Sequence, residues 1–134
     1  MKLSLFTDIG LRALMRLAGN PEQSFSTGTL AAELRISRNH LTKVIQHLSR
    51  AGYVRSKRGH RGGIELARPA DQIRVGDVIA ELETDTSLVE CFRADGGACT
   101  LSPACKLHAT LAGAKQHFIE ELNQTTLGDI AYRI

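Results

Sequence analysis

Three cysteines carry the clearest chemical signal in this sequence of 134 residues. Seven residues separate Cys91 from Cys99, and five separate Cys99 from Cys105. Three thiols in one short segment cannot all pair as disulfides within the chain, which points to metal binding or thiol chemistry. The closely spaced cysteine pair of a structural zinc site is absent, whereas long intervals containing glycine suit a loop around a larger centre such as an iron–sulfur cluster.

A four-ligand cluster needs one donor besides the three thiols. The sequence offers Asp8 near the N-terminus, Glu90 beside Cys91, and His108 three residues after Cys105. On spacing alone His108 is the simplest choice, because positions i and i+3 share one face of a helix. An isolated histidine on a helix is also common as a plain surface residue, so the spacing leaves all three donors open.

The elements that must position these donors begin with three helices in the first half of the chain. Apolar spacing and capping residues predict one helix over residues 7–19 with Thr7 as N-cap, one after a cap at Ser26 or Thr27, and one over residues 38–50 capped by Ser37. Gly52 supplies the left-handed stop of the third helix. The tight turn between the second and third helices is typical of a helix-turn-helix.

A basic β-hairpin follows the third helix. Residues 53–58 and 64–67 read as strands, and the glycine-rich residues 59–63 read as the turn between them. A helix-turn-helix followed directly by such a hairpin predicts a winged helix-turn-helix. The overall fold class is therefore mainly α with a small β-hairpin.

The third helix and the wing carry side chains suited to double-stranded DNA. Arginine and asparagine make bidentate contacts to guanine and adenine in the major groove, and lysine suits phosphate. A winged helix that binds protein is the alternative. The predicted DNA-binding residues are Ser37, Arg38, Asn39, His40, Lys43, Lys57, Arg58, His60 and Arg61.

The net charge also differs between the predicted DNA-binding half and the cysteine-containing half of the chain. Residues 1–70 have a net charge of +8 and residues 71–134 a net charge of −5. A basic half indicates a face that meets a polyanion, although an uneven solvated surface is an alternative. We expect a DNA-binding region over residues 1–70 and a cluster-binding loop with a dimerisation helix over residues 71–134, within one compact chain.

The second half should contain two more helices on either side of the cysteines. A short helix is expected around residues 75–82, and residues 84–102 read as an ordered loop without sustained periodicity. The pair Ser102-Pro103 predicts the start of a long helix that ends near Asn123. A short helix through Ile130 should follow, capped by Thr125 or Thr126.

The long helix carries a narrow apolar stripe. Such a stripe suits a seam between two subunits, so we expect a homodimer. An ordinary amphipathic helix that faces its own core is the alternative. The residues of the stripe are Leu107, Leu111, Ala114, Phe118 and Leu122.

With these residues in view, the chain resembles the iron–sulfur winged-helix regulators of the NsrR and IscR kind over nearly its whole length, and it is closer to the NsrR kind. The matching segments are residues 5–8, 10–14, 37–40, 48–54, 62–64 and 101–107. The resemblance implies a homodimeric repressor, and we expect such a dimer to bind a palindromic operator. It also implies that nitric oxide attacks the cluster and relieves repression.

The resemblance also implies a set of metal ligands. The family pattern places the cluster on Cys91, Cys99 and Cys105, with Asp8 of the partner subunit as the fourth ligand and a 4Fe-4S centre preferred over 2Fe-2S. His108 stands where the IscR kind has its histidine ligand, so both candidate donors are present. An IscR-like 2Fe-2S regulator, or a DNA-binding protein switched by thiols or zinc, is the alternative function.

Other function classes find less support. No apolar run is long enough for a membrane span and no signal peptide is evident, so we expect a cytoplasmic protein without a membrane partner. No nucleotide loop, acid–base pair or nucleophile–base arrangement stands out, and we expect a protein that is not an enzyme. An iron–sulfur electron carrier would have no use for the basic wing.

Overall fold

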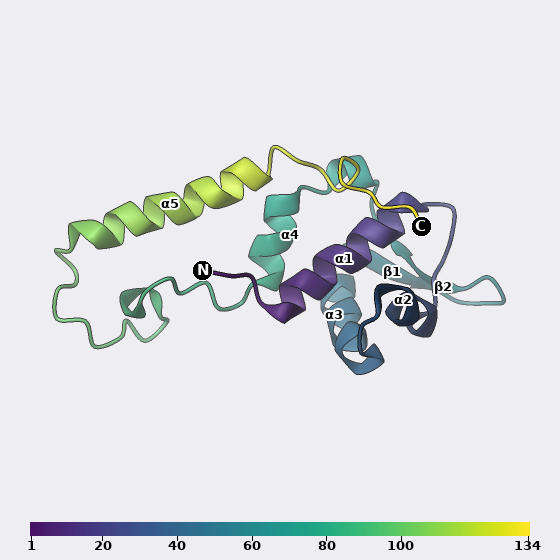
Figure 1. The fold of residues 1–134 in the computed structure, drawn as a ribbon, viewed down its shortest axis with the longest axis horizontal. Helices are drawn as coiled ribbons and strands as arrows, with labels where there is room; N and C mark the ends of the chain where they lie inside the picture. Colours follow the sequence, from purple (N-terminus) through teal and green to yellow (C-terminus); the bar gives the residue numbers. More distant parts are fainter.

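A computed structural model describes residues 1–134. Helices α1 to α4 and the hairpin gather at one end of the long axis, while α5 and the segment before it extend toward the other end (Figure 1). The elements in chain order are α1 (Leu5–Gly19), α2 (Thr27–Leu34), α3 (Arg38–Arg50), β1 (Val54–Lys57), β2 (Gly63–Leu66), the 3-10 helix η1 (Ala70–Gln72), α4 (Val75–Leu82), the 3-10 helix η2 (Glu90–Phe92) and α5 (Lys106–Leu122). The predicted fold class is confirmed. None of the helices is both long and apolar enough to span a membrane.

One hydrophobic core joins α1, α2, α3, α4 and the hairpin. The predicted apolar faces supply it: Leu14, Leu30, Leu41 and Leu48 are each completely buried. Burial of such a side chain contributes about 1.5–3 kcal/mol, so these residues fix how α3 is held against α1 and α2. The opposite, polar face of α3 therefore remains exposed to solvent.

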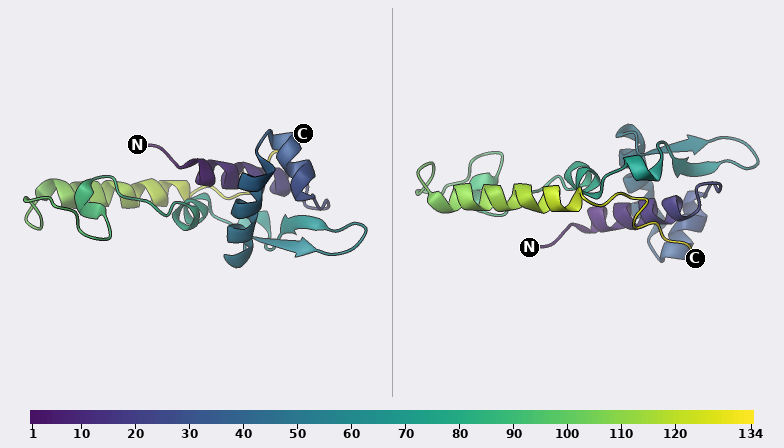
Figure 2. Two further views of the ribbon diagram at one scale, coloured as in Figure 1. Left: turned by 90° about the horizontal axis from the view of Figure 1, so that it is seen from below. Right: turned by 90° about the horizontal axis from the view of Figure 1, so that it is seen from above.

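The hairpin is antiparallel and attached to the core. Val54 pairs with Leu66 and Lys57 with Gly63. The backbone of Ile64 exchanges two hydrogen bonds with Phe25, a buried residue in the segment before α2. This bridge anchors the base of the wing, while its tip projects from the end of the molecule opposite the cysteine segment (Figure 2).

The start of α1 differs from the prediction. Ser4, not Thr7, is the N-cap, and its Oγ accepts a hydrogen bond from the backbone N–H of Thr7. Thr7 lies inside the first turn and is completely buried. Both residues are suitable caps by type, but the Thr7 hydroxyl donates to Glu83, at the end of α4, instead of capping the helix.

The second half also corrects two predictions. The long helix starts at Lys106 with Cys105 as N-cap, so the local signal of Ser102-Pro103 placed its start too early. Thr126 forms an isolated β-bridge with Arg74, and residues 127–130 form turns instead of a final helix. Leu127 is buried there and its backbone N–H bonds to the carbonyl of Ile73, which ties the chain after α5 to the winged-helix core.

Helices α4 and α5 meet at Gly76. A Cβ at this position would collide with the carbonyl oxygen of Ile119 and the side chain of Asn123. The Asn123 side chain also accepts from the backbone N–H of Asp77 and donates to its carboxylate, both at 2.9 Å. The close approach and these two bonds fix the direction in which α5 leaves the core.

The Gly76→Ala protein should therefore be less stable. We expect a loss of about 1–3 kcal/mol in the free energy of unfolding, because the added methyl group pushes α5 away from α4. Gly28→Ala, in α2, is the control, since its added Cβ meets only Ser26 Oγ at 3.9 Å. Chemical denaturation should show Gly28→Ala unchanged or up to about 1 kcal/mol more stable. Equal stability of both variants would contradict the role of this contact.

Candidate nucleic-acid interface and metal-ligating segment

Helix α3 presents one polar face. Its apolar residues face the core, and the predicted recognition residues Ser37, Arg38, Asn39, His40 and Lys43 are all exposed. The side chain of Ser37 makes no capping hydrogen bond, which leaves its hydroxyl available for another partner. The first turn of α3 therefore offers hydrogen-bonding groups and positive charge at the exposed start of a helix, the arrangement that enters a major groove.

The wing offers a second cationic surface. Lys57, Arg58, His60 and Arg61 are all exposed around the turn. Gly62 is required there because a Cβ would collide with the carbonyl oxygens of Lys57 and Gly59. The tight turn lets the backbone and its cations approach a phosphate backbone closely.

Two other arginines of this half are committed to contacts within the chain. Arg55 forms an ion pair at 2.8 Å with Glu65, its partner across the hairpin. Arg12 donates to the carbonyl oxygen of Leu34 at 2.6 Å, at the end of α2. This bond satisfies a carbonyl at a helix C-terminus, where positive charge is favourable. Spacing along the sequence gave no signal for the Arg12 contact, because its acceptor is a backbone atom on another helix.

The three cysteines are free and half-buried. Cys91 lies in η2, Cys105 caps α5, and Cys99 lies in the loop between them. No group of three histidine, cysteine, aspartate or glutamate side chains is close enough to hold a metal ion in this single chain. The one hydrogen bond of a candidate ligand thiol joins Cys91 Sγ and His108 Nδ1, at 3.2 Å.

The other proposed donors lie apart from this contact. Asp8 is an exposed residue of α1, where its carboxylate lies 3.5 Å from the Arg12 guanidinium. Helix α1 lies with α2, α3 and α4, away from η2 and the cysteine segment, which lie beside α5 (Figure 1). Glu90 accepts a hydrogen bond from the backbone N–H of Ala98 and so organises the cysteine loop itself. A role for Asp8 beside the thiols of its own chain finds no support in this arrangement.

The donor chemistry nevertheless fits an iron–sulfur cluster. Three free thiols lie on a single loop that is not held closed by a disulfide, and thiolates are the ligands that such clusters prefer. Gly96 and Gly97 have positive φ angles of 75° and 61°, so the loop turns sharply between Cys91 and Cys99. Cys91, Cys99 and Cys105 are the residues that would hold the group.

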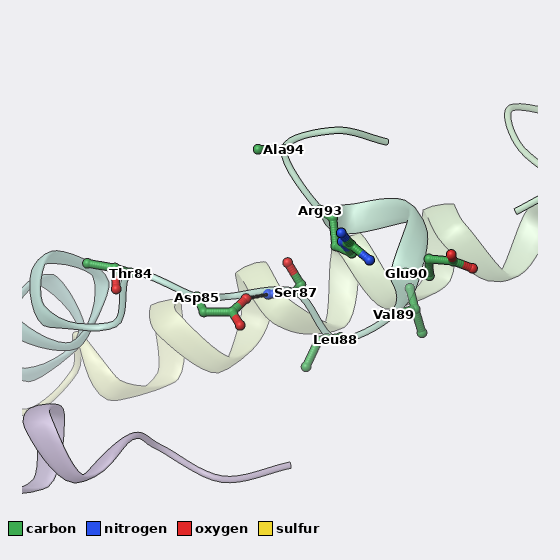
Figure 3. A pocket seen from close by; sticks show the side chains of 8 residues that line it. All are labelled: Thr84, Asp85, Ser87, Leu88, Val89, Glu90, Arg93 and Ala94. Carbon is green, nitrogen blue, oxygen red and sulfur yellow. Dashed lines mark hydrogen bonds between the residues drawn. The ribbon is translucent and has the colours of Figure 1, made fainter. Parts of the chain in front are cut away.

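An open hollow beside the loop has no evident link to this chemistry. Eight residues between Thr84 and Ala94 line it, and Asp85 accepts there from the backbone N–H of Ser87 (Figure 3). Its lining contains none of the cysteines and none of the predicted DNA-binding residues. We assign it no role.

Glu83 links the start of α1 to the start of the cysteine segment. Its carboxylate accepts hydrogen bonds from the Thr7 hydroxyl at 2.7 Å and the Ser4 backbone N–H at 2.8 Å. Partial burial by itself raises the pKa of Glu83, but the hydrogen bonds from Thr7 and Ser4 outweigh burial and the pKa is lowered from 4.5. Sequence reasoning missed this residue, because its partners lie more than 70 positions away.

Replacement of Glu83 by Gln should change the acid sensitivity of the fold. Since the folded-state pKa is lowered, the Glu83 contribution to stability is complete above the usual value of 4.5 and is lost as pH falls through the folded-state pKa. Glu83→Gln should be less stable than the unmodified protein at pH 7 and should converge with it in acid. Thermal unfolding between pH 7 and pH 3 measures this. An exposed carboxylate, Glu22, provides the control variant Glu22→Gln. A constant gap between Glu83→Gln and the unmodified protein at every pH would contradict the assignment.

Comparison with known proteins supports the same organisation. The family model Rrf2, described as an iron-dependent transcriptional regulator, matches residues 3–133. The structure of T. potens IscR has a TM-score of 0.78 and 28% identity, covering 97% of this chain and 85% of that one. CymR of B. subtilis, described as its global cysteine regulator, has a TM-score of 0.77 and 29% identity, covering 98% and 96%. CymR of Staphylococcus aureus has a TM-score of 0.74 and 29% identity, covering 98% of each chain.

Proposed function

The chain belongs to the Rrf2 family of DNA-binding transcriptional regulators, and we propose that it is a homodimeric repressor whose operator affinity is controlled by an iron–sulfur cluster that senses nitric oxide. The family consists of regulators rather than enzymes. The observation that carries the finer proposal is the set of three free thiols on one loop, at the far end of the molecule from the wing. The proposed ligands are Cys91, Cys99 and Cys105.

The proposed dimer rests on α5. None of its residues is fully buried within the chain, and Leu107 and Phe118 have 59% and 39% of their surfaces exposed. A helix with apolar residues exposed along its length needs a partner, and a second copy of the same helix provides one. Dimerisation would bring two recognition helices to a palindromic operator with half-sites about one helical turn or more apart.

The fourth ligand is proposed to be Asp8 of the partner subunit. Asp8 is exposed, and in one chain its helix lies away from the cysteine segment, which favours donation of Asp8 by a second copy. When bound, the cluster would supply iron that reacts with nitric oxide. An oxygen ligand binds that iron less firmly than a thiolate and leaves it open to attack.

Control of DNA binding would pass through α1. Asp8 and Arg12 form an ion pair, and Arg12 in turn bonds the Leu34 carbonyl immediately before the turn of the helix-turn-helix. A carboxylate recruited by the partner would change the contacts of Arg12. Small shifts of this kind would move the two recognition helices relative to each other, so that they no longer match two grooves.

The experiment that tests this proposal is anaerobic purification followed by absorption spectroscopy and iron and sulfide analysis. We expect about four irons per chain, as a 4Fe-4S centre requires. Nitric oxide should bleach the spectrum and weaken operator binding, and Asp8→Ala should alter the stability of the cluster. Glu22→Ala, an exposed carboxylate of the same half, is the matched control.

Other outcomes would replace the proposal. Two irons per chain and dependence on His108 would indicate a 2Fe-2S regulator of the IscR kind. A colourless protein with zinc, or one that responds only to thiol oxidants, would indicate a thiol or zinc switch. In either case the assignment of the DNA-binding half would be unaffected.

A further inference from the structure

His108 faces Cys91 rather than the cysteine nearest to it on the helix. Its Nδ1 lies 3.2 Å from Cys91 Sγ, although the two residues are 17 positions apart. Cys105 is only three positions before His108, yet no hydrogen bond joins them. Both partners in the observed contact are half-buried. The imidazole thus connects α5 to η2.

The orientation of this imidazole is fixed by its neighbours. The ring of Phe92, the residue after Cys91, meets the His108 ring edge to face, with centroids 4.7 Å apart and planes at 82°. The Lys115 ammonium lies 5.9 Å from the centroid of Phe92 and donates to Thr86 Oγ1 at 2.6 Å. Phe92 thus contacts the His108 ring directly, and Lys115 and Thr86 support the position of Phe92.

The chemistry of the contact restricts what His108 does. A cysteine that binds metal does so as a thiolate, whose sulfur only accepts hydrogen bonds, so a proton on Nδ1 must point at it. Hydrogen bonds to cysteine sulfurs tune clusters and orient their ligands. We infer that His108 is a positioning residue that donates from Nδ1 to the sulfur of Cys91 and is not an iron ligand. This inference rests on the proposed function, which assigns Cys91 to the cluster.

The contact itself is tested in the cluster-free protein. The ¹⁵N resonances of the His108 imidazole should shift at Nδ1 when Cys91 is replaced by Ala. They should remain in place in the matched Cys105→Ala variant. The reverse result, a shift with Cys105→Ala alone, would overturn the inference. Because no cluster is involved, this result does not depend on whether the proposed function is correct.

The role toward the cluster is tested with three substitutions of His108. The side-chain nitrogen of Asn lies as many bonds from Cα as imidazole Nδ1, whereas that of Gln corresponds to Nε2. His108→Asn should therefore retain the hydrogen bond and keep the iron content, sulfide content and cluster lifetime of the unmodified protein. His108→Gln and His108→Ala should keep the cluster type but lose the cluster about 10–100-fold faster.

Direct ligation would give a different pattern. An amide replaces imidazole poorly as an iron ligand, so His108→Asn and His108→Gln would be equally defective. The unmodified protein would also show nitrogen hyperfine coupling in the electron paramagnetic resonance spectrum of the reduced cluster, and His108→Asn would lose it. Those results would overturn the inference. Absence of any iron from the unmodified protein would instead refute the proposed function, while the imidazole resonances would still decide the contact with Cys91.

Discussion

The Cys99→Ser protein is expected to bind operator DNA with a single affinity, whether or not iron and sulfide have been supplied under anaerobic conditions. Cys99 is half-buried, free, and lies on the loop between the two other proposed ligands. Its loss replaces a thiolate, the soft ligand that iron–sulfur clusters prefer, with a hydroxyl, which is a poorer ligand for them. In the unmodified protein, loading should change operator affinity by about 5–150-fold, the usual range for coupled sites.

The measurement is a titration of labelled operator DNA at one fixed salt concentration, with loaded and unloaded protein compared for each variant. Thr100→Ala is the matched control, because Thr100 is the exposed neighbour of Cys99 and supplies no thiol. Thr100→Ala should keep the difference between loaded and unloaded protein, and nitric oxide should abolish that difference. A Cys99→Ser protein whose operator affinity still differs between loaded and unloaded protein would contradict the assignment of this thiol.

The sequence predicted the winged helix closely because its signals are local. Helix α3 begins at Arg38 and ends at Arg50, as the cap at Ser37 and the stop at Gly52 indicated, and Gly52 does have a positive φ of 82°. The same reasoning failed for α5. Ser102-Pro103 is a valid start signal, but the segment around it belongs to the cysteine loop, and the helix begins only after Cys105.

The sequence could locate the candidate metal-binding segment, but it could not predict which of its side chains contact each other. Spacing identified the three cysteines and placed His108 beside Cys105, since only residues on the same helix could be compared. The structure gives His108 a different neighbour, Cys91, because the chain turns back along α5. Contacts between segments that are distant in sequence depend on the path of the loop, which has no periodic pattern.

The position of Asp8 shows a second limit. The number of residues between Asp8 and the cysteines cannot show whether Asp8 reaches the thiols of a partner subunit. Within one chain, the helix that carries Asp8 lies away from the cysteine loop. What the structure adds is the ion pair with Arg12 and the bond from Arg12 to Leu34, which place Asp8 two contacts away from the turn of the helix-turn-helix. A sequence pattern could predict the helix, but not this connection.

Arg38 and Lys57 should affect DNA binding in different ways. Arg38 is the first residue of α3 and is exposed, so its guanidinium can reach a base edge in the major groove. We expect Arg38→Ala to cost about 1–3 kcal/mol on the operator and much less on unrelated DNA. Lys57 lies at the end of β1, where phosphate is the expected partner. Lys57→Ala should weaken binding to both DNAs and lower the slope of log K against log salt by about 0.9.

Arg55→Ala is the control for the loss of positive charge on the same strand. Its guanidinium is held by Glu65 at 2.8 Å, so its removal should reduce affinity less than the removal of Lys57, whose ammonium forms no ion pair within the chain. Operator and unrelated duplexes titrated at several salt concentrations separate the three variants. If Arg38→Ala and Lys57→Ala lowered affinity equally on both duplexes, base recognition by α3 would be wrong. The basic half of the chain would then act through its charge alone.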